Sequence, residues 1–324
     1  MDYRTLGRTG VEVSQLCFGT MSFGGDADAE TSAALYRRCR DAGINFFDTA
    51  NVYSAGRSEE ILGDLIKDER DQLVITSKVC GGMGPGPNQR GLSRRHIALQ
   101  VEDTLRRLQT DRLDFYFVHN FDKTTPVEDT LRTLDDLVRQ GKILYPAVSN
   151  WAAWQIALAL GHSACESLAS FACVQPMYNL VKRQAEVEIL PLAQDRRLGV
   201  IPYSPLGAGL LTGKYGVEKR PPSGRLLEKD TYIRRYSEGT YYEIAERFID
   251  YARQEGTHPA TLAVAWVAKH PAVTAPIIGA RNLEQLEPSL QATEFDMSEE
   301  MRAEISALSV EPPLATDRSD DRAA

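Results

Sequence analysis

The stretch that decides the fold is residues 43–50, which read GINFFDTA. A glycine of the kind that ends helices comes first, a short apolar strand follows, and the strand ends in the polar residues Asp48 and Thr49. The same alternation of amphipathic stretch, turn and apolar run recurs along the chain. Its repetition predicts parallel strands joined by helices, because parallel neighbours need a long crossover connection.

Eight apolar runs fit this pattern, and the expected strands are residues 16–18, 45–48, 73–79, 113–118, 143–148, 172–175, 200–203 and 274–278. The amphipathic stretches between them predict helices, for example at residues 30–42, 94–108, 127–140, 185–196 and 283–292. Eight strand–helix units in 324 residues predict an α/β fold, the (β/α)8 TIM barrel. Residues 4–13 are expected to form a β-hairpin that plugs the bottom of this barrel.

Two segments do not follow the alternation. Residues 207–239 contain Gly, Pro-Pro and mixed charges, which predicts a long mobile loop after the seventh strand. Residues 312–324 are charged and small, which predicts a disordered C-terminal tail. No linker divides the remainder, so residues 1–311 are expected to form one domain.

The bulk composition narrows the classes of partner. A net charge of −8 argues against binding to nucleic acid or to an anionic membrane surface. The five cysteines are odd in number and widely spaced, which argues against a disulfide framework or a thiolate metal site. The chain begins without a signal peptide pattern and contains no apolar run long enough to span a membrane. We therefore expect a cytoplasmic protein that binds no metal, with its oligomeric state left open.

Polar side chains follow three neighbouring strands of the expected barrel. Asp48 ends the second strand and its loop brings Tyr53, Lys78 ends the third, and His119 follows the fourth. Because the working residues of such barrels lie at the carboxyl ends of the strands, these four side chains are expected to meet at one mouth.

An acid, a phenol, an amine and an imidazole suit proton transfer to a carbonyl. A phenol has a pKa near ~10, and a neighbouring ammonium is expected to lower it. Asp48 would keep Lys78 charged, because an unpaired buried ammonium is costly. His119 would orient the substrate carbonyl while Tyr53 donates its proton as a hydride arrives. The chemistry therefore favours reduction by an organic hydride donor.

At these residues the sequence resembles the aldo-keto reductase family. The matching motifs occur in order from about residue 3 to 310, at residues 6–10, 43–50, 58–63, 77–79, 113–119, 149–151, 203–206 and 279–281. The resemblance implies a catalytic tetrad of Asp48, Tyr53, Lys78 and His119, with Tyr53 as general acid. It also implies NADPH-dependent reduction of an aldehyde or ketone to the alcohol.

The resemblance further implies a binding site for NADP. The residues expected to contact the cofactor are Gly19, Thr20, Ser149, Asn150, Gln175, Tyr203, Ser204, Leu206, Gly209, Gly279, Arg281, Gln285 and Ser289. Arg281 favours NADP over NAD, because a guanidinium suits a 2′-phosphate. Pro288 and Ser289 stand where the family often has Glu-Asn, which leaves the strength of that preference open.

Three other functions remain open from the residues alone. The same tetrad could oxidise a sugar or a secondary alcohol with NADP. Lys78 could act as the nucleophile of a Schiff-base aldolase. The chain also resembles potassium-channel β-subunits, which would make it a cofactor-sensing subunit. The expected substrate is a small carbonyl or alcohol. An apolar or ring-shaped one is favoured by the residues expected near the mouth, namely Met21, Phe23, Tyr53, Phe121 and Trp151.

Overall fold

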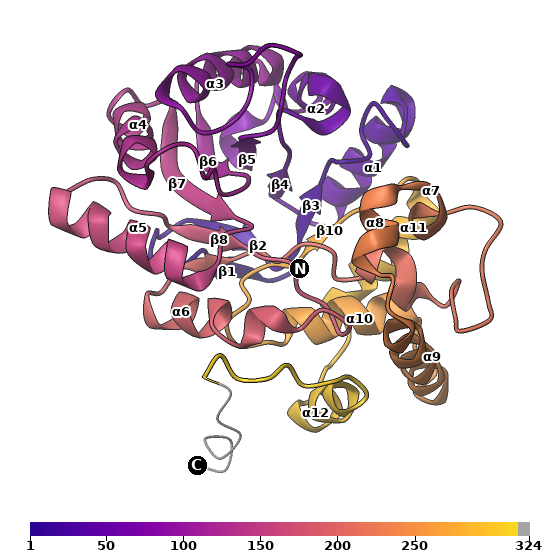
Figure 1. Ribbon diagram of the computed structural model, residues 1–324. Coiled ribbons are helices and arrows are strands. Elements are labelled where there is room, and N and C mark those ends of the chain that lie inside the picture. Colours follow the sequence, from indigo (N-terminus) through magenta and orange to yellow (C-terminus); the bar gives the residue numbers. More distant parts are fainter. Residues whose placement is uncertain (317–324) are drawn as a thin grey trace.

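The computed structural model describes residues 1–316, and its centre is a sheet of eight parallel strands surrounded by helices (Figure 1). The strands are β3 (Cys17–Gly19), β4 (Phe46–Asp48), β5 (Val74–Val79), β6 (Leu113–Val118), β7 (Ile143–Ser149), β8 (Cys173–Gln175), β9 (Gly199–Val200) and β10 (Ile277–Ile278). Their order in the sheet is β10-β3-β4-β5-β6-β7-β8-β9. The α/β barrel expected from the sequence is therefore confirmed.

Backbone hydrogen bonds join the two ends of this sheet. The amide of Ile277 donates to the carbonyl of Pro202 at 2.8 Å, and the amide of Thr274 donates to Val200 at 2.9 Å. The strand expected at residues 200–203 is thus shorter, as is the one expected at 274–278. Prolines at positions 202 and 276 have no N–H, so a regular ladder cannot form there.

Helices cover the outer face of the sheet. They are α1 (Ala29–Asp41), α2 (Arg57–Ile66), α3 (Arg94–Leu108), α4 (Val127–Arg139), α5 (Ala153–Glu166), α6 (Ile189–Asp195), α9 (Gly239–Gln254), α10 (Pro259–Ala268), α11 (Leu283–Leu290) and α12 (Glu299–Ala307). Among residues 1–316, none of these helices is both long and apolar enough to cross a membrane.

The N-terminal hairpin is formed by β1 (Tyr3–Thr5) and β2 (Glu12–Ser14), which pair antiparallel. Its apolar residues Leu6 and Val13 are fully buried and pack with the side chains that fill the barrel. Leu6 touches the start of β9, since a Cβ on Gly199 would lie 2.4 Å from Leu6 Cδ1. The hairpin therefore closes the end of the barrel at which the strands begin, as the sequence predicted.

Strand alternation explains which residues face the barrel interior. Side chains two positions apart on a strand point to the same face. Phe46 and Val74 belong to the cluster that fills the barrel, whereas Ile75 packs with the helices. By this parity Asp48 in β4 and Lys78 in β5 face inward. The same parity turns inward the polar residues that end or follow β6, β7 and β8, namely His119, Ser149 and Gln175.

The connection after β9, where a long mobile loop was expected, includes short helices. It contains the 3₁₀ helix η4 (Gly207–Thr212) and the short helices α7 (Arg225–Glu228) and α8 (Asp230–Arg235). Leu226 and Tyr236 of this connection are buried, so it packs on the barrel. Residues 312–316 form no helix or strand, and the rest of the expected tail, 317–324, lies outside the described residues. The assignment of residues 1–311 to one domain stays a prediction.

Candidate active site

The carboxyl ends of β4 and β5 bring a carboxylate and an ammonium together inside the barrel. Lys78 Nζ donates to Asp48 Oδ2 at 2.6 Å and to the carbonyl oxygen of Thr49 at 2.6 Å. Lys78 is 0% exposed and Asp48 is 2% exposed. Burial by itself lowers the pKa of Lys78, but the charge of Asp48 and their hydrogen bond outweigh it, so the pKa is raised. Lys78 is therefore an ammonium at neutral pH.

The second oxygen of the Asp48 carboxylate is held as firmly as the first. Thr76 Oγ1 donates to Asp48 Oδ1 at 2.6 Å, and Gln175 Nε2 donates to the same atom at 2.9 Å. Thr76 lies on the neighbouring strand β5, while Gln175 ends β8 on another part of the barrel wall. The carboxylate is thus fixed by groups from two strands, β5 and β8, and its orientation toward Lys78 is set in advance.

Tyr53 reaches this pair from the 3₁₀ helix η1 (Tyr53–Gly56). Its hydroxyl lies 3.4 Å from Lys78 Nζ, and the chain turns back beneath it through Ser54 (φ 48) and Ala55 (φ 55). Burial raises the pKa of Tyr53, while the charge of Lys78 opposes this effect without cancelling it. The lowered pKa expected from the sequence is thus wrong for the protein alone. The raised pKa keeps Tyr53 protonated and able to donate.

His119 stands edge-on to the Tyr53 ring, with the ring centres 6.0 Å apart. Burial and, to a smaller extent, the charge of Lys78 lower the pKa of His119 to about 3. The imidazole is therefore neutral at physiological pH. A neutral imidazole can donate one hydrogen bond without moving its own proton to the acceptor.

The depressed pKa of His119 predicts how stability depends on pH. An unfolded histidine has a pKa near 6.5, so between about 3 and 6.5 the unfolded state binds more protons and stability falls as the pH falls. Urea unfolding of the wild type and of His119→Asn should therefore be compared at about pH 7 and about pH 5, where one proton corresponds to up to ~1.4 kcal/mol per pH unit. The wild type should lose more stability than the variant. Equal losses would contradict the buried, neutral imidazole.

Asn150 and Tyr203 extend the site along the barrel mouth. Asn150 has a left-handed backbone (φ 58), and its Nδ2 donates to the carbonyl of His119 at 2.9 Å. The Tyr203 hydroxyl donates to Asn150 Oδ1 at 2.7 Å. An aromatic ring and a carboxamide are thus held next to each other, beside the histidine of the tetrad.

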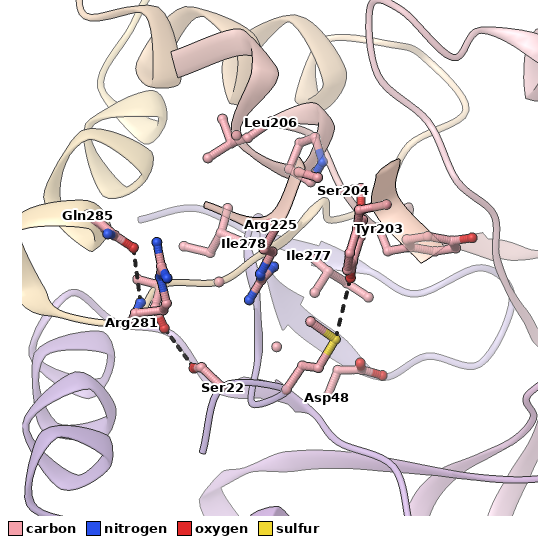
Figure 2. Close-up of a pocket in the computed structure, with 18 of the residues that line it drawn as sticks. Ser22, Asp48, Tyr203, Ser204, Leu206, Arg225, Ile277, Ile278, Arg281 and Gln285 are labelled. Carbon is pink, nitrogen blue, oxygen red and sulfur yellow. Dashed lines mark hydrogen bonds between the residues drawn. The ribbon is translucent and has the colours of Figure 1, made fainter. Parts of the chain in front are cut away.

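A cavity of about 860 Å³ opens over these residues. In Figure 2, Asp48 and Tyr203 lie toward one end of it and Arg281 and Gln285 toward the other, with Arg225 between them. Of the residues singled out in the sequence, those that line the cavity are Gly19, Asp48, Tyr53, His119, Asn150, Gln175, Tyr203, Ser204, Leu206, Gly209, Gly279, Arg281 and Gln285. Lys78 lies behind Tyr53 and contacts it.

Three residues expected to contact a cofactor do not line this cavity. Thr20 is fully buried, and its hydroxyl bonds Ser58 at 2.8 Å. The Ser149 hydroxyl donates to the carbonyl of Gln175 at 2.9 Å. Ser289 is 1% exposed on the inner side of α11, whereas its neighbour Pro288 lines the cavity. In this structure all three support the walls of the site.

Three cations that the sequence analysis did not single out also line the cavity, namely Lys214, Arg225 and Arg235. All come from the connection between β9 and α9. Arg225 lies 3.8 Å from Asp26, which belongs to the loop after β3. This segment has no helical or strand periodicity in the sequence, so only the clustering of basic residues in it could have pointed to them.

Three of the five residues expected at the substrate mouth lie elsewhere. Phe23 is 0% exposed and packs against Phe18, with ring centres 5.8 Å apart. Phe121 packs edge-on against Trp151 at 4.9 Å, and neither lines the cavity. Met21 and Tyr53 do line the cavity, so the expectation of an apolar substrate rests on these two residues alone.

Comparison with known proteins agrees with this geometry. The profile described as the aldo/keto reductase family matches residues 15–310. The chain belongs to the aldo/keto reductase family. Its tetrad candidates and its cavity all lie within the matched residues.

Three relatives show the range of proteins to which this aldo/keto reductase is similar. It is 37% identical over 312 residues to the uncharacterized oxidoreductase YrpG of Bacillus subtilis, covering 93% of this chain and 94% of that protein. It is 39% identical over 300 residues to a probable voltage-gated potassium channel subunit beta of Oryza sativa, covering 90% of this chain and 91% of that protein. A protein of the same description from Arabidopsis thaliana is 35% identical over 302 residues, covering 91% and 92%. The family and the first relative make this chain an oxidoreductase.

Proposed function

We propose that this aldo/keto reductase uses NADPH to reduce an aldehyde or ketone to the alcohol. The observation that carries the proposal is the buried chain of Asp48, Lys78 and Tyr53, which ends in a protonated phenol at the wall of a large cavity. A proton donor is one half of what carbonyl reduction requires, and a place for a hydride donor is the other.

The distal part of the cavity fits the phosphates of a dinucleotide. Burial lowers the pKa of Lys214, and the nearby charges of Arg281 and Arg225 lower it further. Within residues 1–316, neither Lys214 nor Arg281 has a carboxylate in ion-pair distance. Cations gathered without counter-ions repel one another, and bound phosphates would relieve that repulsion.

The backbone next to these cations leaves room for a ligand. Gly209 has a left-handed backbone (φ 95), and a Cβ there would lie 2.8 Å from Lys214 Cε. Glycine at this position therefore lets Lys214 reach the cavity. At the proximal end Tyr203 offers an aromatic face, and Asn150 and Gln175 offer carboxamides that can bond the amide of a nicotinamide ring.

The chain's own residues account for the proton and for orientation. NADPH, when bound, supplies the hydride for the carbonyl carbon. His119 donates a hydrogen bond to the carbonyl oxygen and aligns it with the Tyr53 hydroxyl. Tyr53 transfers its proton to that oxygen, and the ammonium of Lys78 stabilises the phenolate that remains. In the reverse direction, oxidation of an alcohol, the same phenolate accepts the proton.

Arg281→Ala should weaken NADPH binding and leave NADH binding almost unchanged. The guanidinium lines the distal end of the cavity beside Gln285, and its loss removes a charge-assisted contact to a 2′-phosphate. We expect the Kd for NADPH to rise by about 10- to 100-fold. The measurement is titration with each nucleotide, followed by quenching of tryptophan fluorescence.

Arg253→Ala is the matched control, because Arg253 is exposed on α9 and, among residues 1–316, pairs only with its helix neighbour Asp250. It should change neither affinity. Equal weakening of NADPH and NADH in Arg281→Ala would contradict the assignment of the 2′-phosphate. Carbonyl-dependent loss of NADPH absorbance tests the reaction itself. Tight NADPH binding with no turnover of any carbonyl would instead favour the cofactor-sensing role that the resemblance to potassium-channel β-subunits implies.

A further inference from the structure

Arg235 at the end of α8 is a cation of the cavity that the proposed cofactor site does not use. Its half-buried side chain lines the same cavity as Tyr53 and Tyr203. None of residues 1–316 forms an ion pair or a hydrogen bond with its guanidinium. In a protein of net charge −8, a partly desolvated guanidinium without a carboxylate partner is unusual, because desolvation without pairing is costly.

Arg235 lies in a different part of the cavity from Lys214 and Arg281, the cations at its distal end. The cations whose charges lower the pKa of Lys214 are Arg281 and Arg225, and Arg235 is not among them. Arg235 is instead close enough to Tyr203 to affect the pKa of that phenol. Burial raises the pKa of Tyr203 to about 12, and the charge of Arg235 opposes that rise. Tyr203 also borders Asn150 and, through it, the tetrad. Arg235 therefore lies toward the end of the cavity where the carbonyl would react.

Tyr232 holds Arg235 in place without neutralising it. The centre of the Tyr232 ring lies 5.5 Å from the Arg235 guanidinium carbon and 5.8 Å from that of Arg225. The Tyr232 hydroxyl reaches Met21 Sδ at 3.8 Å, on the loop after β3. A cation over an aromatic face keeps its full charge and its N–H donors. Arg235 is thus oriented and still free to bind an anion.

We propose that Arg235 binds an oxyanion group of the substrate, so that the preferred substrates are aldehydes or ketones that also carry a carboxylate or a phosphate. This inference rests on the proposed function. The planar guanidinium offers parallel N–H donors that match two oxygens of either group. The charged group is held at the α8 side of the mouth while the carbonyl lies at Tyr53 and His119.

The test compares matched substrates, one with and one without the anionic group. Values of kcat/KM with NADPH are measured for 4-carboxybenzaldehyde against its neutral carboxamide, and for glyceraldehyde 3-phosphate against glyceraldehyde. Arg235→Gln should reduce the preference for the anionic member by about 10- to 100-fold and leave the neutral member almost unchanged. Arg234→Gln is the control, because Arg234 is the exposed neighbour on the same helix and does not line the cavity. If Arg235→Gln loses the preference within the benzaldehyde pair, the recognised group is a carboxylate. If it loses the preference within the glyceraldehyde pair, the recognised group is a phosphate.

A binding measurement keeps the test independent of turnover. Calorimetric binding of 4-(hydroxymethyl)benzoate to the NADP-saturated protein should be lost in Arg235→Gln and retained in Arg234→Gln. An unchanged preference in Arg235→Gln would overturn the inference and leave the proposed reductase intact. If Arg235→Gln binds NADPH more weakly and loses kcat/KM equally for both members of each pair, the inference would be overturned in favour of a contact between Arg235 and the cofactor. No turnover of any carbonyl by the wild type would overturn the proposed function and this inference together.

Discussion

Tyr53→Phe is expected to lower kcat for carbonyl reduction by about 10²- to 10⁴-fold, the usual contribution of a positioned general acid. The substitution removes the hydroxyl that lies 3.4 Å from Lys78 Nζ and keeps the ring that packs edge-on against His119. Because the ring remains, the affinity for NADPH should change little. Steady-state rates and nucleotide titrations on the same preparation measure both quantities.

Tyr251→Phe is the matched control for this experiment. Tyr251 lies on α9, and its hydroxyl donates to Glu304 at 2.7 Å, away from the cavity. It should leave kcat and the affinity for NADPH at the wild-type values. A Tyr53→Phe protein that keeps the wild-type kcat would refute the assignment of Tyr53 as proton donor.

Asp48→Asn is expected to destabilise the fold by about 3–5 kcal/mol, as removal of one partner of a buried ion pair generally does. Lys78 is 0% exposed, so the variant would leave an ammonium inside the barrel without a counter-charge. Burial, the largest effect on Lys78, lowers its pKa, and without Asp48 only Tyr53 opposes it, so the amine should tend to lose its proton. The free energy of unfolding in urea measures the loss.

Two further proteins separate the buried charge from other effects of this substitution. In Asp48→Asn with Lys78→Met, no charge is left unpaired, so the double variant should be more stable than Asp48→Asn alone. Asp250→Asn removes the exposed partner of Arg253 and should cost no more than about 1 kcal/mol. If Asp48→Asn unfolds with the same free energy as the wild type, the buried pair does not hold the site together.

The accuracy of the fold prediction varied with the local pattern. Residues 113–118 match β6 because five apolar or aromatic residues, interrupted only by Asp114, are bounded by the polar residues Arg112 and His119. The strands predicted at residues 200–203 and 274–278 are shorter in the structure, because prolines interrupt the hydrogen-bond ladder there. The connection after β9 could not be placed from the sequence, since its short helices form against the barrel and carry no periodicity of their own.

The inner part of the site was predictable for a different reason. Asp48 and Lys78 were expected to meet because both end strands whose carboxyl ends share one mouth of the barrel. In the structure, alternation along the strands turns both side chains inward. The outer part depends on helix phase and on tertiary contacts. One residue on a helix is a rotation of about 100°, and this separates Pro288 at the cavity from Ser289 in the interior. The net pKa of Tyr53 also required the structure, because sequence alone does not weigh burial against a neighbouring charge.

The three contacts of Lys78 decide what kind of reagent this amine can be. A nucleophilic amine needs an unshared electron pair directed at a carbonyl carbon. In Lys78 the nitrogen is protonated, and its three hydrogens are directed to Asp48, to the backbone of Thr49 and to the Tyr53 hydroxyl. No electron pair and no open approach remain on that nitrogen. The Schiff-base chemistry left open by the sequence is therefore closed to this lysine, whose part is that of a fixed positive charge.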